Sequence, residues 1–274
     1  MRHRGVLLGT VSIVLFSVVF IVPFIFILLS AAKSPSEAAE FSFSLPTHWH
    51  LLDNLKGALQ ARDYILVIAL INSTILTVSA VALLVVFSAM AAYVLQRRKS
   101  KLNPVVNMFV LAGLIIPPAV VPTIWVLQRL HLFRTMSGLI FVEVALGMAF
   151  CVLLFRAFIS TIPRELDEAA LIDGAGPIRL FFQVIFPLLR SVIVTVIVLQ
   201  SVFVFNDFQN PLYFLPGDEN ATAQLTLFNF QSQFNTQYNL LFANMLLITV
   251  LPLVMFLFFN KRIVAGMTAG AVKG

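Results

Sequence analysis

Charged residues are scarce in this chain of 274 residues. Asp, Glu, Lys and Arg together make up 11% of it, whereas about 25% of the residues in a soluble domain are charged. Hydrophobic residues account for 60%, and the mean hydropathy is +0.98. A water-soluble protein cannot hide so much apolar surface, because even a compact globule exposes a large share of its side chains. The composition therefore excludes a soluble protein and predicts an integral membrane protein.

Cysteine and the common catalytic motifs are nearly absent as well. The single cysteine, Cys151, excludes an intrachain disulfide, and its place in an apolar run predicts a buried or lipid-facing side chain. No H-E-x-x-H or G-x-S-x-G motif occurs, and none of the six lysines stands in the phosphate-binding context G-x-x-x-x-G-K-S/T. His48 and His50 have no evident third metal ligand. We therefore expect no metal site and no catalysis, ATP hydrolysis included, from this chain alone.

Long apolar runs, in contrast, fill most of the chain. A helix needs about 20 predominantly apolar residues to cross the hydrocarbon core of a membrane. The runs are continuous, unlike the alternating segments of about ten residues that build a membrane β-barrel. We therefore predict an all-α polytopic membrane protein with a single transmembrane domain over residues 1–274. Its six predicted transmembrane helices cover residues 5–30, 64–95, 104–127, 136–158, 188–212 and 240–260.

The first run resembles a secretory signal in one respect, since basic residues precede it. Residues 6–29, however, carry no charge. This uncharged length is well beyond the apolar core of about 7–15 residues in such signals. We therefore expect a retained span.

Basic residues set the expected orientation, because cytoplasmic loops of membrane proteins are enriched in Lys and Arg. With the N-terminus inside, 13 basic residues fall on the cytoplasmic side and 5 on the outer side. This distribution supports six spans with both the N- and C-termini cytoplasmic. The net charge of +6 then follows from topology, without a nucleic-acid partner.

One loop departs from the apolar pattern. The stretch "ELDEAALIDGAGPIRLFFQVIFP" lies in the predicted cytoplasmic loop 159–187 and combines acids with glycine and proline. Acids in a first turn suit the helix dipole, Gly174 can end a helix in the left-handed conformation, and Pro163 and Pro177 suit helix starts. The residues thus predict two short helices joined by a bend. On the residues alone, the loop is equally a helix lying on the membrane or a docking element for a cytoplasmic partner.

A motif in this loop favours docking. The residues "EAALIDG" are followed, after nine residues, by "VIFP". This pattern resembles the signature loop of permease subunits of ATP-binding-cassette importers. Val184 and Phe186 depart conservatively from the isoleucine and leucine of the family pattern. The matching residues are Glu168, Ala169, Ala170, Gly174 and Pro187.

In that family the loop forms a coupling helix that seats in a groove of an ATPase subunit. The resemblance implies the same role here, with small alanines allowing close approach and Gly174 supplying the bend. The residues implied for this ATPase-coupling surface are Glu165, Asp167, Glu168, Ala169, Ala170, Asp173, Gly174 and Ala175.

More of the chain resembles the six-span, maltose-type permeases of carbohydrate importers. The similar stretches are "NSTIL" (72–76), the proline-rich residues 114–140, "VFNDFQNPLYF" (204–214) and the tail "KRIVAGMTAGAVKG" (261–274). Phe205 stands where the family usually has tryptophan. In the maltose type the cytoplasmic tail reaches into the ATPase dimer. The resemblance therefore implies ATPase contacts from Gly266, Gly270, Lys273 and Gly274.

The resemblance also implies an assembly at a prokaryotic cell (inner) membrane. Its other members would be a second, non-identical permease, two ATPase subunits that bind ATP and Mg, and an extracytoplasmic sugar-binding protein. No cofactor is implied for this chain. The outer segment 213–239 is the expected contact with the binding protein.

Polar side chains within spans are costly in a membrane and often functional. Interhelical hydrogen bonds are the alternative explanation for each of them. No Lys or Arg stands in the middle of a span, which favours a neutral mono- or oligosaccharide over a phosphorylated substrate. The candidate substrate-path residues are Asn72, Glu143, Gln200, Asn206, Asp207 and Asn210.

Other functions stay open at this point. A permease of the same family for glycerol phosphate or a polyol fits the motifs. An ion-coupled secondary transporter needs buried acids, for which Glu143 is the candidate, but it does not need the signature loop. No paired catalytic residues support a membrane-embedded enzyme.

Overall fold

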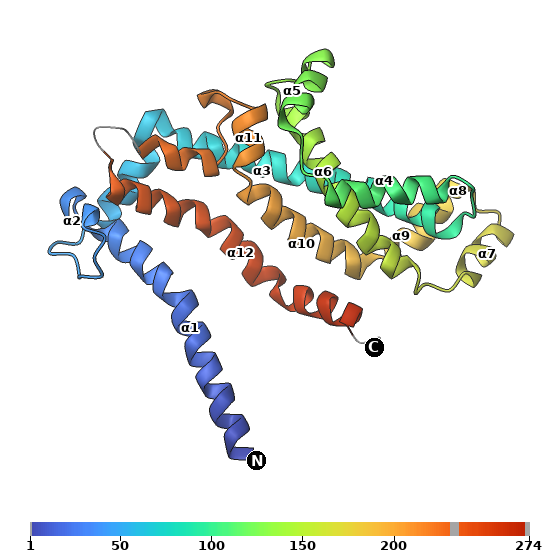
Figure 1. Ribbon diagram of the computed structural model, residues 1–274, viewed down its shortest axis with the longest axis horizontal. Coiled ribbons are helices and arrows are strands. Elements are labelled where there is room, and N and C mark those ends of the chain that lie inside the picture. The colour runs from blue at the N-terminus through green and yellow to red at the C-terminus, as the bar shows by residue number, and fades with distance from the viewer. Residues whose placement is uncertain (1, 231–235, 272–274) are drawn as a thin grey trace. The chain divides into compact units, whose positions relative to one another are not determined.

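The computed structural model describes residues 2–230 and 236–271, which form helices and loops without a β-strand (Figure 1). The all-helical prediction is thus confirmed for the described residues. The elements are α1 (Arg2–Ala32), α2 (Pro35–Ala39), α3 (Leu51–Arg97), α4 (Asn103–Ile115), α5 (Val120–Arg129), α6 (Met136–Ile159), α7 (Glu165–Ile172), α8 (Pro177–Arg179), the π-helix η1 (Leu180–Ile185), α9 (Phe186–Leu188), α10 (Arg190–Asn206), α11 (Gln209–Phe214), the 3-10 helices η2 (Asp218–Asn220) and η3 (Gln224–Phe230), and α12 (Tyr238–Ala271).

Three helices are long and apolar enough to cross a membrane within the described residues. They are Gly9–Ala32 of α1, the whole of α3, and α6. Two bent helix pairs raise the number to as many as five if each pair counts as one span. A further apolar stretch, Tyr238–Val254 of α12, is shorter. The predicted total of six spans therefore stays a prediction.

The first of these bends divides one of the predicted spans. Residues 104–127 form α4 and α5, and the chain bends by 119° between them instead of continuing as one helix. The cause is local, because Pro117 and Pro118 follow α4, and a residue before proline disfavours helical backbone. Ile116 accordingly ends α4 in an extended conformation. The second bend, of 77°, separates Pro177–Leu188 from α10.

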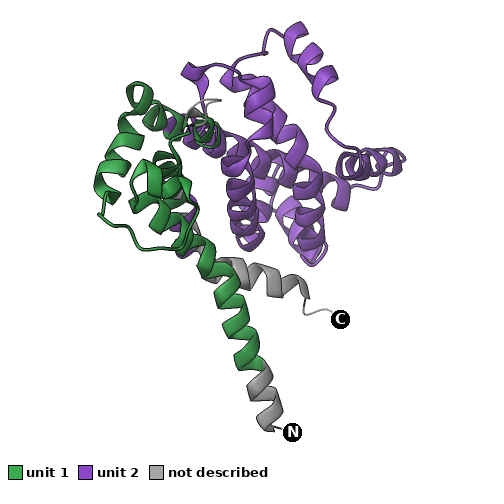
Figure 2. Ribbon diagram, turned by 60° about the vertical axis from the view of Figure 1, so that its left-hand side comes forward, with its two compact units in different colours: residues 1–70, 223–251 green, residues 71–222, 252–274 purple. Residues whose placement is uncertain are grey.

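The chain divides into two compact units, residues 1–70 with 223–251 and residues 71–222 with 252–274 (Figure 2). Unit 1 has its own apolar core, in which the rings of Phe26 and Phe242 meet edge-on with centroids 5.5 Å apart. The buried Asn54 donates 2.8 Å hydrogen bonds to the carbonyl oxygens of Ala31 and Lys33. The prediction of a single membrane domain is not tested by this division.

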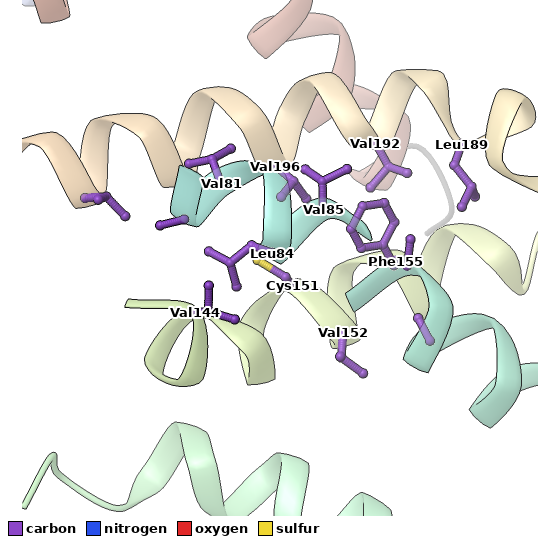
Figure 3. Packing of buried hydrophobic residues seen from close by; sticks show 14 of the residues in the cluster. Val81, Leu84, Val85, Val144, Cys151, Val152, Phe155, Leu189, Val192 and Val196 are labelled. Carbon is purple, nitrogen blue, oxygen red and sulfur yellow. The ribbon is translucent and has the colours of Figure 1, made fainter. Parts of the chain in front are cut away.

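The core of unit 2 is built by α3, α6 and α10. Side chains of the three helices converge in Figure 3, with Leu84 from α3, Cys151 and Phe155 from α6, and Val192 and Val196 from α10. All of them are buried. Of the two places predicted for Cys151, buried or lipid-facing, the structure shows the buried one.

Gly147 lets these three helices approach closely. A Cβ atom at this position of α6 would lie 2.9 Å from Leu84 Cδ1 of α3 and 3.1 Å from Gln200 Oε1 of α10. Small residues at helix crossings are typical of membrane bundles, where close van der Waals packing drives helix association.

We expect Gly147→Val to destabilise the protein by about 1–3 kcal/mol, because the added side chain overpacks the crossing of three helices. The measurement is the thermal unfolding midpoint of the purified protein in detergent. The matched control is Gly9→Val in α1, where nothing lies within 4 Å of an added Cβ atom. Equal midpoints for the two variants would contradict this assignment.

Candidate functional site

The loop between α6 and α10 is locally ordered from its sequence. Helix α7 begins at Glu165 with three acids in its first turn, and Arg164 is its N-cap. Pro163 lies just before the cap, so its predicted place in the first turn is wrong by two residues. After α7, Gly174 has a φ of +79°, its N–H donates to Leu171 O, and the Ala175 N–H donates to Ala170 O. This pair of bonds is a Schellman motif, which glycine permits and which rigidly defines the bend.

The second half of the loop also starts as the sequence predicts. Pro177 is at the first turn of α8, and Gly176 is its N-cap. The chain then continues through η1 and α9 into α10, which completes the predicted pair of short helices joined by a bend.

Helix α7 has an exposed face and a buried face. Ile172 is 85% exposed, and Ile178 in α8 is 76% exposed. Two bulky apolar side chains are thus exposed in the loop that carries the acids of α7. Among the predicted ATPase-coupling residues, Asp167 and Ala170 are buried and Ala175 is half-buried, while the exposed ones are Glu165, Glu168, Ala169, Asp173 and Gly174.

The Asp167 carboxylate faces the C-terminal end of α3. The Tyr93 hydroxyl donates to Asp167 Oδ1 at 2.6 Å, and Arg97 Nη2 lies 2.9 Å from Asp167 Oδ2. Arg97 also donates to the carbonyl oxygen of Ile162 at 3.0 Å. Our reading of the sequence missed Tyr93 and Arg97. Their four-residue spacing at the end of an apolar helix was the available signal, since it places both side chains on one face.

Three candidate substrate-path residues come together where α10 ends. Asn210 Nδ2 donates to Glu143 Oε1 at 3.1 Å, and Glu143 is only 1% exposed. Asp207 Oδ1 accepts from the first two backbone N–H groups of α11, those of Gln209 at 2.9 Å and Asn210 at 3.4 Å. The second carboxylate oxygens of Glu143 and Asp207 are buried without a hydrogen-bond donor among the described residues. These hydrogen bonds link α6 to α11, and the cluster contains more buried hydrogen-bond acceptors than donors to serve them.

The other three candidates, also in unit 2, have contacts of their own. Asn72 Nδ2 donates to the carbonyl oxygens of Glu219 at 3.3 Å and Ala221 at 3.1 Å. Asn206 Nδ2 donates to the Val202 carbonyl oxygen at 2.8 Å, within its own helix. Gln200 packs at Gly147, one turn along α6 from Glu143. Interhelical or local hydrogen bonds thus account for most of these polar side chains.

Unit 2 also contains a cavity of about 430 Å³ between α5, α6 and Phe214. Thr123 is the one polar side chain among its lining residues, and its hydroxyl already donates to the Ala119 carbonyl oxygen at 2.8 Å. An apolar cavity of this kind offers few of the hydrogen bonds that a sugar requires.

The remaining predicted positions are at the C-terminus. Gly266 and Gly270 lie within α12, whereas Lys273 and Gly274 lie outside the described residues. No group of three or more His, Cys, Asp or Glu side chains that could hold a metal ion occurs in the described part of the chain.

Side-chain hydrogen bonds also hold segment 33–50 in a defined conformation. Ser34 and Glu37 form a capping box at the start of α2, and Glu37 accepts from both the hydroxyl and the backbone N–H of Thr47. These hydrogen bonds, first those from Thr47 and then those from Ser34, lower the pKa of Glu37 from 4.5 to about 2.

The long apolar helices and the signature loop with its capped helix α7 are the features of a membrane permease subunit. The chain belongs to the family described as binding-protein-dependent transport system inner membrane component, whose pattern matches residues 84–268. It is therefore an inner-membrane protein, and the resemblance seen in its signature loop is confirmed.

Several relatives are named as permeases for sugars or sugar derivatives. The probable starch degradation products transport system permease protein AmyC of Thermoanaerobacterium thermosulfurigenes is 36% identical over 97% of this chain and 96% of its own. The melibiose/raffinose/stachyose import permease protein MelC of Bacillus subtilis is 37% identical over 74% and 75%. The diacetylchitobiose uptake system permease protein NgcG of Streptomyces coelicolor is 32% identical over 95% and 87%.

The fold is that of a solved importer. A chain of a bacterial ABC transporter involved in the import of the acidic polysaccharide alginate matches with a TM-score of 0.79 at 18% identity, covering 95% of this chain and 96% of that one. A second structure, of the alginate transporter in complex with alginate pentasaccharide-bound periplasmic protein, matches with a TM-score of 0.69 at 15% identity over 95% and 94%.

We expect Glu143→Leu to cost about 1–3 kcal/mol of stability, because it leaves the buried Asn210 amide without its acceptor. Glu143→Gln keeps an acceptor and adds an N–H group that can serve Asp207, so it should preserve the unfolding midpoint. The measurement is thermal unfolding of both variants in detergent. A midpoint for Glu143→Leu as high as that of the unmodified protein would refute the assigned link.

The Glu37 contacts predict a pH dependence. Because the pKa of Glu37 is lower in the folded loop than the usual 4.5, its stabilisation is complete above about pH 4.5 and is lost as pH falls toward about 2. The difference in unfolding midpoint between the unmodified protein and Glu37→Gln should follow this window. Glu40→Gln, an exposed acid beside the same helix, is the control. A difference that stayed constant from pH 6 to pH 3 would exclude the mechanism.

Proposed function

We propose that this chain is one of two membrane-spanning permease subunits of an importer that carries a neutral mono- or oligosaccharide into the cell. ATP and Mg are bound by separate ATPase subunits, which hydrolyse the ATP. The observation that carries the proposal is α7, a short helix with exposed Glu168, Ala169 and Ile172, ended by a rigid bend at Gly174. Such a helix offers another protein a small contact surface of fixed conformation.

The sugar class rests on the relatives. The three named above are described as permeases for starch degradation products, for melibiose, raffinose and stachyose, and for diacetylchitobiose. All of these are sugars or sugar derivatives. The relatives therefore do not favour the alternative, a permease for glycerol phosphate or a polyol, and the particular sugar is a matter for uptake assays.

The proposed arrangement has six spans, with both termini and α7 in the cytoplasm. The excess of basic residues in the loops that would then be cytoplasmic supports it. In this arrangement Glu165, Glu168, Ala169 and Asp173 face the ATPase, and the end of α12 with Gly266 and Gly270 extends toward it.

The proposed partners are a second, non-identical permease, two ATPase subunits and an extracytoplasmic sugar-binding protein. The family description, which names binding-protein-dependent transport, supports the binding protein. The outer segment 213–239 is its proposed contact. The exposed apolar side chains of α1 support a contact with lipid or with the second permease.

We expect Glu168→Arg to reduce the amount of co-purified ATPase subunit by on the order of tenfold, or ~1.4 kcal/mol, because it reverses a charge on the docking face. The measurement is affinity purification of the assembled complex from detergent-solubilised membranes. The matched control is Glu40→Arg, an exposed acid in the predicted outer segment, which should retain the ATPase fully.

Uptake of labelled sugars by cells that express the complete system then tests the substrate class. Sugar uptake that requires the binding protein and is lost with Glu168→Arg is the expected result. Purification of the unmodified chain alone, without an ATPase or second permease, would overturn the proposal.

A further inference from the structure

We propose that Tyr93, Arg97 and Asp167 form a clamp that fastens α7 to α3, so that motion of the docked α7 passes directly into α3. This inference rests on the proposed function and deepens it. It assigns Asp167 a positioning role inside the subunit rather than a contact with the ATPase. It adds two positioning residues, Tyr93 and Arg97, that no motif of the signature loop contains.

The first support is the burial of the charges. Only 13% of the Arg97 side chain and 11% of the Asp167 side chain are exposed. A carboxylate removed from water is stable only when cations and hydrogen-bond donors replace its hydration. Arg97 supplies the charge at 2.9 Å and Tyr93 supplies the hydroxyl at 2.6 Å. Both of these partners belong to α3, so the stability of the buried acid depends on keeping α7 against that helix.

The second support is that the clamp holds the connection on both sides. Arg97 donates to the Ile162 carbonyl oxygen at 3.0 Å, just before α7, and Arg164 donates back to the Gln96 carbonyl oxygen at 3.4 Å. The Tyr93 ring lies 5.5 Å, centre to centre, from that of Phe181 in η1. The end of α3 therefore contacts the segments before and after α7 as well as α7 itself.

The third support is the division of α7 into two faces. Glu168 and Ala169 are exposed, whereas Asp167 and Ala170 are buried. Neighbouring residues in a helix point about 100° apart, so one short helix can carry an outward docking face and an inward face for transmission. When a docked partner moves α7, the movement reaches the membrane helices through the contacts of the inward face. At Asp167 that contact is the end of α3.

The test uses the complete transporter, with its binding protein, reconstituted in proteoliposomes, and it measures sugar uptake and ATP hydrolysis together. Asp167→Asn and Arg97→Gln should keep co-purified ATPase and ATP hydrolysis within about twofold of the unmodified complex. Sugar moved per ATP should fall by roughly tenfold, which corresponds to ~1.4 kcal/mol. Arg97→Lys, which keeps the charge, should restore at least half of the lost ratio. The double variant should be no worse than either single one, because both remove the same link.

Arg98→Gln is the matched control, since it neutralises an exposed basic residue directly after Arg97. It should leave the sugar-to-ATP ratio unchanged. A normal ratio in Asp167→Asn would overturn the clamp, and so would loss of the ATPase subunit from that variant, since Asp167 would then act in docking. Failure of the unmodified chain to retain any ATPase would instead reject the proposed function.

A second measurement follows the distance between α3 and α7. Spin labels at Val94 of α3 and Leu166 of α7, both exposed, are placed in a Cys151→Ala background. The distance between them should stay the same in nucleotide-free and nucleotide-bound transporter, and Tyr93→Phe or Asp167→Asn should broaden it. A distance that changes with nucleotide in the otherwise unmodified protein would show that α3 and α7 move separately, which contradicts the proposal.

Discussion

The hydrocarbon core of a membrane offers no hydrogen-bond partner, and the rest of this structure depends on that constraint. Backbone polar groups must be satisfied within the chain, which is why the described residues build helices. Interruptions occur where the sequence supplies a local cause. Pro117 and Pro118 separate α4 from α5, and the Asp207 carboxylate accepts the first N–H groups of α11 after α10 has ended. Because lipid tails are as apolar as the surfaces of the helices, the hydrophobic effect does not drive the helices together. Close packing at small residues such as Gly147 decides instead which helices meet.

Burial inside the protein likewise requires that charges be compensated, and this chain meets that requirement differently at two buried acids. Asp167 is matched by the cation of Arg97 and the hydroxyl of Tyr93, so its charge is compensated by one neighbouring helix. Glu143 receives one amide hydrogen bond from Asn210 and keeps a buried oxygen without a donor. The first arrangement suits a fixed joint between two elements. The second suits a link between α6 and α11 that tolerates an amide in place of the acid.

The coupling loop shows how far sequence reasoning reaches at the candidate site. The acids, the glycine bend and the second proline predict α7, its end and the following helix, because each acts through backbone geometry over a few residues. Whether an acid of α7 faces a partner or its own subunit is not a local property. Asp167 and Glu168 are adjacent and chemically alike, yet their surroundings differ, because the position of α3 is set by contacts across some seventy residues of chain.

The sequence by itself determined the membrane class, the helical architecture, the family and the place of the coupling loop, since apolar length, charge distribution and a spaced motif act without tertiary information. Only the tertiary structure decided that Glu143 meets Asn210 and that Asp167 turns inward to Arg97. The physical reason is that hydrophobicity identifies which segments leave water, whereas the directional contacts of buried polar groups arise only when packed helices bring distant residues within hydrogen-bonding distance.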